Sequence, residues 1–184
     1  MKTRYYWFKI YSLILSLLAD LFKRISCLWL FVALNMVAPV TNANELKVLI
    51  GKVEQQYNIP KGLLLAIAKV ESRIEPYALN IGGKAIFKDS KEAALRLIDQ
   101  HLRANHTNID IGVMQINYRW HFGEFKDIAE MIEPQKNIDY AARLLTGLHK
   151  QHKDWQKAVR LYHSAKPQHH TKYSRKIIIA WLNT

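Results

Sequence analysis

The amino-acid sequence predicts a compact, mainly helical domain with a small hairpin at most, preceded by an N-terminal signal or anchor segment. Apolar residues recur at helical spacing through most of residues 44–184, and proline or glycine separates many of these segments. Nearly half of the 184 residues are apolar and 23% are charged, which is typical of a folded chain. We therefore divide the sequence into a leader, residues 1–43, and one domain, residues 44–184.

Residues 1–43 have the pattern of an export signal. Lys23 and Arg24 precede an apolar run, Ile25–Val40, and small residues then offer a cleavage site at the end of the segment. This run of about 16 residues is shorter than the roughly 20 that cross a bilayer as a helix. A second apolar stretch, Tyr5–Phe22, leaves a retained membrane anchor as the alternative to a cleaved signal. We expect an exported protein that contacts a membrane only through this leader.

The first two helices of the domain follow from their start and stop residues. Asn44 is a suitable N-cap for a helix that Asn58 and Pro60 interrupt. Pro60 then suits the opening of a second helix, which we expect to end before Pro76 because a residue preceding proline avoids the helical conformation. Glu71 lies in the last turn of this second helix.

The remaining helices are predicted by apolar residues three and four positions apart, and three of them begin at typical start residues, Ser90, Pro134 and Asp154. The expected order is a short extended or hairpin segment at Ile81–Ser90, a helix from Ser90 to about Arg103, a short apolar element at Ile111–Ile116, and helices at Pro134–Gln151, Asp154–Ser164 and Lys172–Leu182.

Charge and cysteine content limit the classes of partner and chemistry. Residues 1–43 hold five basic and one acidic side chain, so residues 44–184 hold 22 basic and 14 acidic ones, a net charge of +8. A basic domain favours an anionic partner, such as nucleic acid, a membrane surface or bacterial cell wall. The single cysteine, Cys27, lies in the leader, so the domain has no disulfide, thiol nucleophile or thiolate metal site.

Glu71 stands at the end of an apolar helical stripe. Leu64, Ile67 and Ala68 precede it by seven, four and three residues, which places all four on one face. A carboxyl group at the end of a buried stripe loses water, so its pKa rises and it can hold a proton near neutral pH. Enzymes that cleave polysaccharides need such a proton donor at the glycosidic oxygen. The alternative is a helix-end glutamate that reaches solvent.

Four segments share one explanation when they are read in order. They are AKVES (Ala68–Ser72), IDIGVMQIN (Ile109–Asn117), NIDYAARLL (Asn137–Leu145) and AVRLYHSA (Ala158–Ala165). Together they resemble the soluble lytic transglycosylase (SLT) domain, which has a goose-type lysozyme fold, over about Glu45–Thr184. The resemblance is closest to the small members that accompany secretion, conjugation and pilus systems. It implies an α+β lysozyme-like domain.

The resemblance implies one catalytic residue, Glu71, and no cofactor or metal. It also implies five substrate-binding residues along a groove, namely Ser72, Gln115, Asn117, Tyr162 and Tyr173. Ser72 matches a serine near the sugar, and Tyr162 matches a tyrosine that hydrogen-bonds the catalytic carboxyl. The sequence departs from the family motif at His163, where asparagine is usual, and at Ala165, where glycine is usual.

The activity implied by this resemblance is that of a peptidoglycan lytic transglycosylase, a carbon–oxygen lyase. It would cleave the β-1,4 bond between N-acetylmuramic acid and N-acetylglucosamine and leave 1,6-anhydromuramic ends. The implied partners are glycan strands and components of a secretion, conjugation or pilus machine, in the periplasm of a Gram-negative bacterium, with an inner-membrane anchor if the leader is retained. The export signal counts against a nucleic-acid partner.

Two other functions stay open at this point. One is a goose-type, lysozyme-like muramidase that hydrolyses the bond, which needs a second carboxylate near Glu71; Asp110 is the best candidate by sequence. The other is a non-catalytic wall-binding assembly factor that keeps the groove only for docking.

Overall fold

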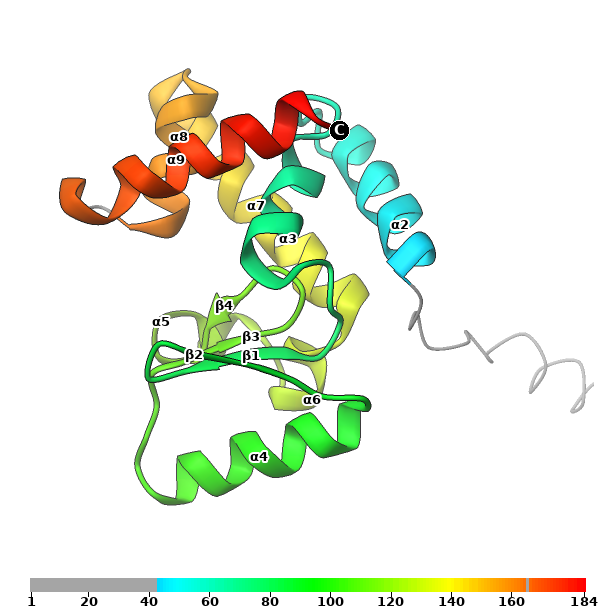
Figure 1. Cartoon of the computed structure of the whole chain (residues 1–184), viewed down its shortest axis with the longest axis vertical. Helices are drawn as coiled ribbons and strands as arrows, with labels where there is room; N and C mark the ends of the chain where they lie inside the picture. The colour runs from blue at the N-terminus through cyan, green and yellow to red at the C-terminus, as the bar shows by residue number, and fades with distance from the viewer. Residues whose placement is uncertain (1–42, 165) are drawn as a thin grey trace, which may run out of the picture. The chain divides into compact units, whose positions relative to one another are not determined.

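The computed structural model of the protein describes residues 43–164 and 166–184 (Figure 1). The predicted signal or anchor segment lies outside these residues except for Ala43. The described helices are α2 (Ala43–Gln56), α3 (Leu63–Ser72), α4 (Lys91–Arg103), α5 (Tyr118–His121), α6 (Ile128–Met131), α7 (Pro134–His152), α8 (Trp155–His163) and α9 (Pro167–Leu182), with a 3-10 turn at Phe122–Glu124. The mainly helical class is confirmed. No helix in the described part of the chain is both long and apolar enough to cross a membrane.

The strands form one antiparallel sheet in the order β2-β1-β3-β4. Their bounds are β1 Ala78–Ile81, β2 Lys84–Phe87, β3 Ile109–Ile111 and β4 Ile116–Asn117. The sheet is larger than the single small hairpin that we expected, because β3 and β4 add a second hairpin beside the first. Its apolar face carries side chains that are buried in the core, among them Leu79, Ile111 and Ile116.

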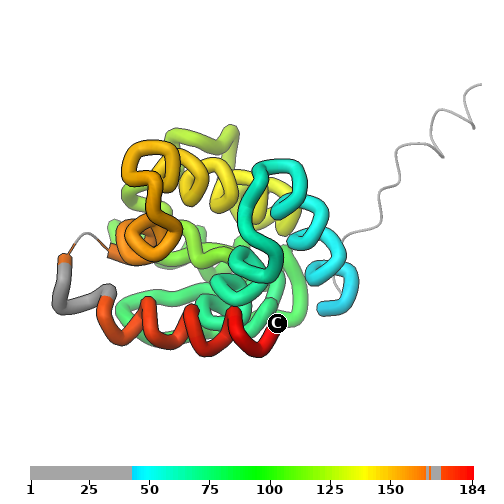
Figure 2. The backbone as a smooth tube through the Cα atoms, turned by 90° about the horizontal axis from the view of Figure 1, so that it is seen from above, coloured from blue at the N-terminus to red at the C-terminus, as the bar shows by residue number. Residues whose placement is uncertain are grey.

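The catalytic candidate lies on the most buried helix. In Figure 1, α4 lies on one side of the sheet, and α3, α7, α8 and α9 lie on the other. Helix α3 is apolar on nearly all sides, which is typical of a helix in the centre of a domain. Figure 2 shows α9 running beside α3, and the Trp181 indole Nε1 donates to the Lys61 carbonyl at 2.8 Å. Helix α9 therefore lies along α3 and is bonded to the segment just before it.

The start of α3 is fixed by Glu54 of α2. This side chain is only 4% exposed, and its carboxylate accepts hydrogen bonds from the backbone N–H groups of Gly62 (2.8 Å), Leu64 (2.8 Å) and Leu65 (3.1 Å). A carboxylate at a helix N-terminus satisfies donors that the helix itself leaves free and interacts favourably with the helix dipole. Glu54 thus caps the N-terminus of α3 from the neighbouring helix.

We expect Glu54→Ala to lower the free energy of unfolding by about 3 kcal/mol, because three N–H groups near the buried start of α3 lose their acceptor. Urea unfolding of the variant beside wild type measures this loss. Glu45→Gln is the matched control, since Glu45 lies exposed on the same helix. Its effect should stay within about 0.5 kcal/mol. Equal stability of Glu54→Ala and wild type would contradict the capping role.

Three predicted helix starts differ from the structure. Helix α2 already includes Ala43, so Asn44 lies in its first turn rather than before it. Helix α3 begins at Leu63 and not at Pro60, because Gly62 has a φ of +82° and interrupts helical geometry. Helix α9 begins at Pro167, where proline suits the first helical turn, instead of at Lys172.

Candidate active site

Glu71 lies partly buried in the last turn of α3. The Tyr173 hydroxyl, on α9, donates to its Oε1 at 2.7 Å. Burial raises the pKa of Glu71 from the usual 4.5 to about 7; the Tyr173 hydrogen bond opposes this shift, and the charge of Asp110 adds to it. At neutral pH the side chain therefore exists in both protonation states, which suits a group that both gives and takes a proton.

The chain turns sharply after Glu71. Arg73 (φ 61°) and Ile74 (φ 66°) both adopt the left-handed conformation, which is uncommon for residues other than glycine. The Ile74 N–H donates to the Ala68 carbonyl at 3.2 Å and closes the helix. Glu71 therefore lies in the final turn of α3. Its carboxyl has Tyr173 of α9 on one side and is influenced by Asp110 of the sheet.

Ser72 connects α3 to the loop between β3 and β4. It is 1% exposed, and its Oγ contacts the carbonyls of Val113 (2.7 Å) and Ala68 (3.2 Å). The side chain is enclosed and its proton serves a backbone carbonyl, so a contact between Ser72 and the sugar stays a prediction. Ser72 instead holds the β3–β4 loop against the end of the catalytic helix.

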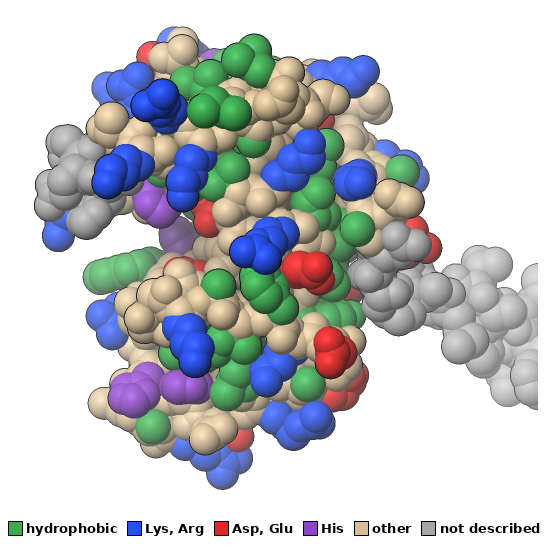
Figure 3. Space-filling view, viewed as in Figure 1, with side chains coloured by type: hydrophobic (Ala, Val, Ile, Leu, Met, Phe, Trp, Pro, Cys, Tyr) green, Lys and Arg blue, Asp and Glu red, His purple; other side chains and the backbone are tan. Residues whose placement is uncertain are grey.

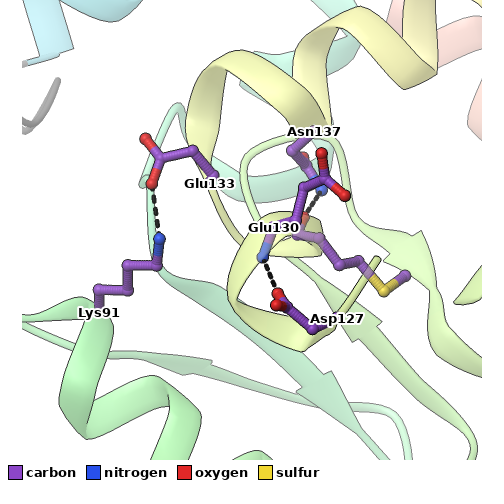
Figure 4. A network of polar contacts seen from close by, with 6 residues as sticks. Lys91, Asp127, Glu130, Glu133 and Asn137 are labelled. Atoms are coloured by element: carbon purple, nitrogen blue, oxygen red, sulfur yellow. Dashed lines mark hydrogen bonds and ion pairs between the residues drawn. The ribbon is translucent and has the colours of Figure 1, made fainter. Parts of the chain in front are cut away.

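The same loop is also bound by Asn137, a fully buried residue of α7 that Figure 4 shows beside Glu130. Its Nδ2 donates to the carbonyls of Ile111 (3.0 Å) and Met131 (2.9 Å), and its Oδ1 accepts from the Met114 N–H at 2.8 Å. Gly112 has a φ of +80°, and a Cβ there would lie 2.7 Å from the Asn137 amide. Only glycine therefore allows this close approach.

Gln115 contributes to the shape of the loop itself. It has a φ of +48°, and its Nε2 donates to the carbonyls of Gly112 (2.8 Å) and Ala78 (3.1 Å). From the sequence, either a sugar or the backbone could be the hydrogen-bond partner of this amide. In the structure its Nε2 donates to two backbone carbonyls. A contact between Gln115 and substrate stays a prediction.

Tyr173, and not Tyr162, makes the hydrogen bond to Glu71. Tyr162 was expected to hydrogen-bond Glu71, but its hydroxyl donates to the Met114 carbonyl at 2.8 Å, whereas Tyr173 makes the bond to Glu71. Burial, and then the nearby charge of Glu71, raise the pKa of Tyr162 well above 10, so this hydroxyl stays protonated. The Tyr162 hydroxyl is instead bound to the β3–β4 loop.

His163 packs on the tyrosine that holds Glu71. Its ring is stacked on that of Tyr173 with centroids 4.1 Å apart and planes 6° from parallel. This is the position where asparagine is usual in the motif, so the departure replaces an amide with an aromatic ring against Tyr173. The contact between Tyr173 and Glu71 could not be read from the sequence, since the two residues are 102 positions apart.

The opposite wall belongs to the sheet. Asn117 of β4 donates through Nδ2 to Asp110 Oδ1 of β3 at 2.7 Å. Burial raises the pKa of Asp110, and the Asn117 hydrogen bond opposes that shift. Figure 3 shows the surface indented between the upper helices and the part below them that includes the sheet, with histidine and acidic side chains on the wall of this hollow. Within residues 43–164 and 166–184, no three histidine, cysteine or acidic side chains converge as metal ligands.

We expect Tyr173→Phe to move the alkaline limb of the pH–rate profile to higher pH. The Tyr173 hydrogen bond lowers the pKa of Glu71, so its loss raises that pKa, and a proton donor stays protonated to a higher pH. The rate at the optimum should fall about tenfold, because the carboxyl loses the contact that orients it. Initial rates of cell-wall solubilisation across pH measure both effects. Tyr57→Phe, just after the end of α2, is the control and should leave the profile unchanged. An unmoved limb in Tyr173→Phe would contradict the assignment.

Asp110→Asn should move the same limb in the opposite direction. The negative charge of Asp110 raises the pKa of Glu71, so a neutral side chain lets that pKa fall and the rate decline at lower pH. The same pH–rate measurement tests this sign. If the alkaline limb moved in the same direction in Asp110→Asn and Tyr173→Phe, one of the two assigned effects on the pKa of Glu71 would be wrong.

A comparison with protein families gives the site its context. The family model described as the transglycosylase SLT domain matches residues 48–176, which include Glu71, the β3–β4 loop, Tyr162 and Tyr173. Comparisons with curated proteins and with solved structures find no significant match. The match covers well over half of the chain and nearly all of the elements that build the groove. The chain therefore belongs to the transglycosylase SLT domain family, whose activity is peptidoglycan cleavage of the lytic transglycosylase type.

Proposed function

We propose that the protein is a lytic transglycosylase in which Glu71 performs both proton transfers. The observation that carries this proposal is a carboxyl group with a pKa of about 7, held by Tyr173, in the groove of an SLT domain. A group with this pKa is a proton donor and, after one transfer, a proton acceptor at the same pH.

The reaction would proceed in two steps that balance without water. Protonated Glu71 gives its proton to the oxygen between N-acetylmuramic acid and N-acetylglucosamine as the bond from that oxygen to C1 of muramic acid breaks. Ionised Glu71 then takes the proton of the C6 hydroxyl of the same muramic acid while the C6 oxygen bonds to C1. The enzyme regains its proton, and the product carries a 1,6-anhydro end.

Mass spectrometry of fragments released from purified sacculi tests the proposal. Anhydro ends support it, and fragments heavier by one water would overturn it. The second outcome would favour a hydrolysing muramidase. One observation supports this alternative, because Asp110 lies near enough for its charge to raise the pKa of Glu71. Two-carboxylate glycosidases use such a second acid as nucleophile or base.

We also propose that the protein is exported to the periplasm and trims the wall locally, so that a secretion, conjugation or pilus apparatus can cross it. The export pattern of residues 1–43 and the resemblance to small specialised members of the family support this proposal. Deletion of the gene, complemented by wild type or by Glu71→Gln, tests it. Loss of transport that only wild type restores supports enzymatic trimming, while restoration by both would favour a wall-binding assembly factor. Intact transport after deletion would overturn the role.

A further inference from the structure

Most of the net charge of the domain lies in its last two helices. Residues 155–184, which include α8 and α9, hold six lysine or arginine residues and no aspartate or glutamate. Because residues 44–184 hold 22 basic and 14 acidic side chains, residues 44–154 hold 16 and 14. The last 30 residues thus carry +6 of the net charge of +8. An anionic partner is therefore attracted chiefly to α8 and α9.

Half of these basic side chains lie on the solvent side of α9. Lys172, Arg175 and Lys176 are exposed, and within residues 43–164 and 166–184 none of the three forms an ion pair. Tyr173 and Ile177, on the buried side of the helix, are 6% and 1% exposed and belong to the core. The charged side chains therefore point to solvent and are not neutralised by the domain itself.

Large apolar side chains are exposed on the same helix. Ile178 is 40% exposed, Ile179 52% and Leu182 82%. Ile178 and Trp181 also line an apolar pocket between α8 and α9, together with Trp155 of α8. Figure 3 shows hydrophobic side chains over the upper helices with lysine and arginine around them. Contiguous apolar surface of this kind marks an interaction site in a soluble domain.

A bilayer surface matches this combination better than a protein partner does. The two most exposed of these apolar residues, Ile179 and Leu182, project outward and do not line the pocket between α8 and α9, so this surface suits a flat, deformable partner. Helices that lie on membranes combine aliphatic and tryptophan side chains with lysine and arginine in this way. The export pattern of residues 1–43 also implies at least one encounter with a membrane.

We propose that the outer face of α9 rests on the surface of an anionic phospholipid bilayer. This face comprises Lys172, Arg175, Lys176, Ile178, Ile179 and Leu182. The aliphatic side chains enter the headgroup region, and the basic ones bind lipid phosphates. Because the contact uses the solvent side of α9, it leaves the bond between Tyr173 and Glu71 uncovered. The proposal does not depend on the proposed reaction.

Fluorescence of a label on α9 tests the inference in the full chain. Cys27→Ser removes the single cysteine, and Ile179→Cys then carries an environment-sensitive nitrobenzoxadiazole label. On vesicles of phosphatidylglycerol and phosphatidylethanolamine the emission should brighten and move to shorter wavelength, and on vesicles of phosphatidylcholine it should stay unchanged. The same label at Gln135→Cys, exposed on α7, is the control and should report solvent on both. Because the label reports only its own surroundings, binding of the leader to vesicles does not mimic the result.

The basic residues are tested by Lys172→Gln, Arg175→Gln and Lys176→Gln combined, which keep a good helix former at each position. Three lost contacts with anionic lipid should lower the ratio of membrane-bound to free α9 about 100-fold. The label signal on anionic vesicles should therefore disappear. Thermal unfolding checks that the variant folds.

The matched control removes the same charge from exposed positions outside α8 and α9, namely by Lys84→Gln, Arg96→Gln and Lys126→Gln combined, and should keep the signal. An unchanged emission at Ile179→Cys on anionic vesicles, or an equal change on neutral ones, would overturn the inference. A photo-crosslinker at the same position that joined α9 to one discrete protein in intact cells would overturn it too, since that result assigns the face to a protein partner. Each of these results leaves the acid–base role of Glu71 untouched.

Discussion

Glu71→Gln is expected to reduce the release of soluble fragments from peptidoglycan by about 10²- to 10⁴-fold, the usual contribution of a positioned acid–base group. Glutamine has nearly the same shape and can still accept from Tyr173, but it can neither give the proton to the glycosidic oxygen nor take one from the C6 hydroxyl. Turbidity loss of purified sacculi and chromatography of the released fragments measure the effect. Glu75→Gln is the matched control, because Glu75 is exposed just beyond the end of α3.

The same substitution should change how stability depends on pH. The pKa of Glu71 is about 7 in the folded protein and close to 4.5 when the chain is unfolded, so the folded state favours the protonated carboxyl. Its contribution is fully present below about pH 4.5 and is lost as the pH rises through about 7, a change of about 3 kcal/mol. Glu71→Gln should therefore gain stability relative to wild type over this range. If the unfolding free energies of wild type and Glu71→Gln changed with pH in parallel, a raised pKa of Glu71 would be contradicted.

Asn137→Ala should lower the free energy of unfolding by about 3–4 kcal/mol, because two carbonyls and one N–H lose their partners and a cavity opens against Gly112. Activity should fall in the folded fraction as well, since Asn137 fixes the loop that carries Gln115 and the Met114 carbonyl. Urea unfolding and sacculus cleavage at low temperature measure the two effects.

Gln135→Ala provides the control for Asn137, since Gln135 lies exposed on the same helix. It should change stability by less than about 0.5 kcal/mol. A loss of less than 1 kcal/mol in Asn137→Ala would show that the loop holds its conformation without this amide.

The helices could be predicted because their signals are local. Ser90 accepts from the Ala93 N–H, Asp154 accepts from the N–H groups that follow it, and Pro134 begins α7, all as expected from the sequence. The pKa direction of Glu71 also follows from its apolar stripe alone. Strands β3 and β4 have three and two residues, too few for an alternating pattern to show in the sequence. They become strands only through the partners that the tertiary fold supplies.

The roles of polar residues in the site were harder to predict, because each depends on which acceptor lies nearest. Ser72 and Tyr162 both turn to carbonyls of the β3–β4 loop, whose tight shape the sequence does not specify. Motif positions thus point to one region of the chain, but they do not predict the individual hydrogen bonds within it.

The bond from Tyr173 to Glu71 also bears on the timing of activity during synthesis. Because the phenol belongs to the last helix, a nascent polypeptide that has reached only α8 lacks the group that orients its carboxyl. The catalytic carboxyl therefore gains its orienting contact only once α9 has been made and has packed against α3. The full rate of the proposed reaction depends on this late step.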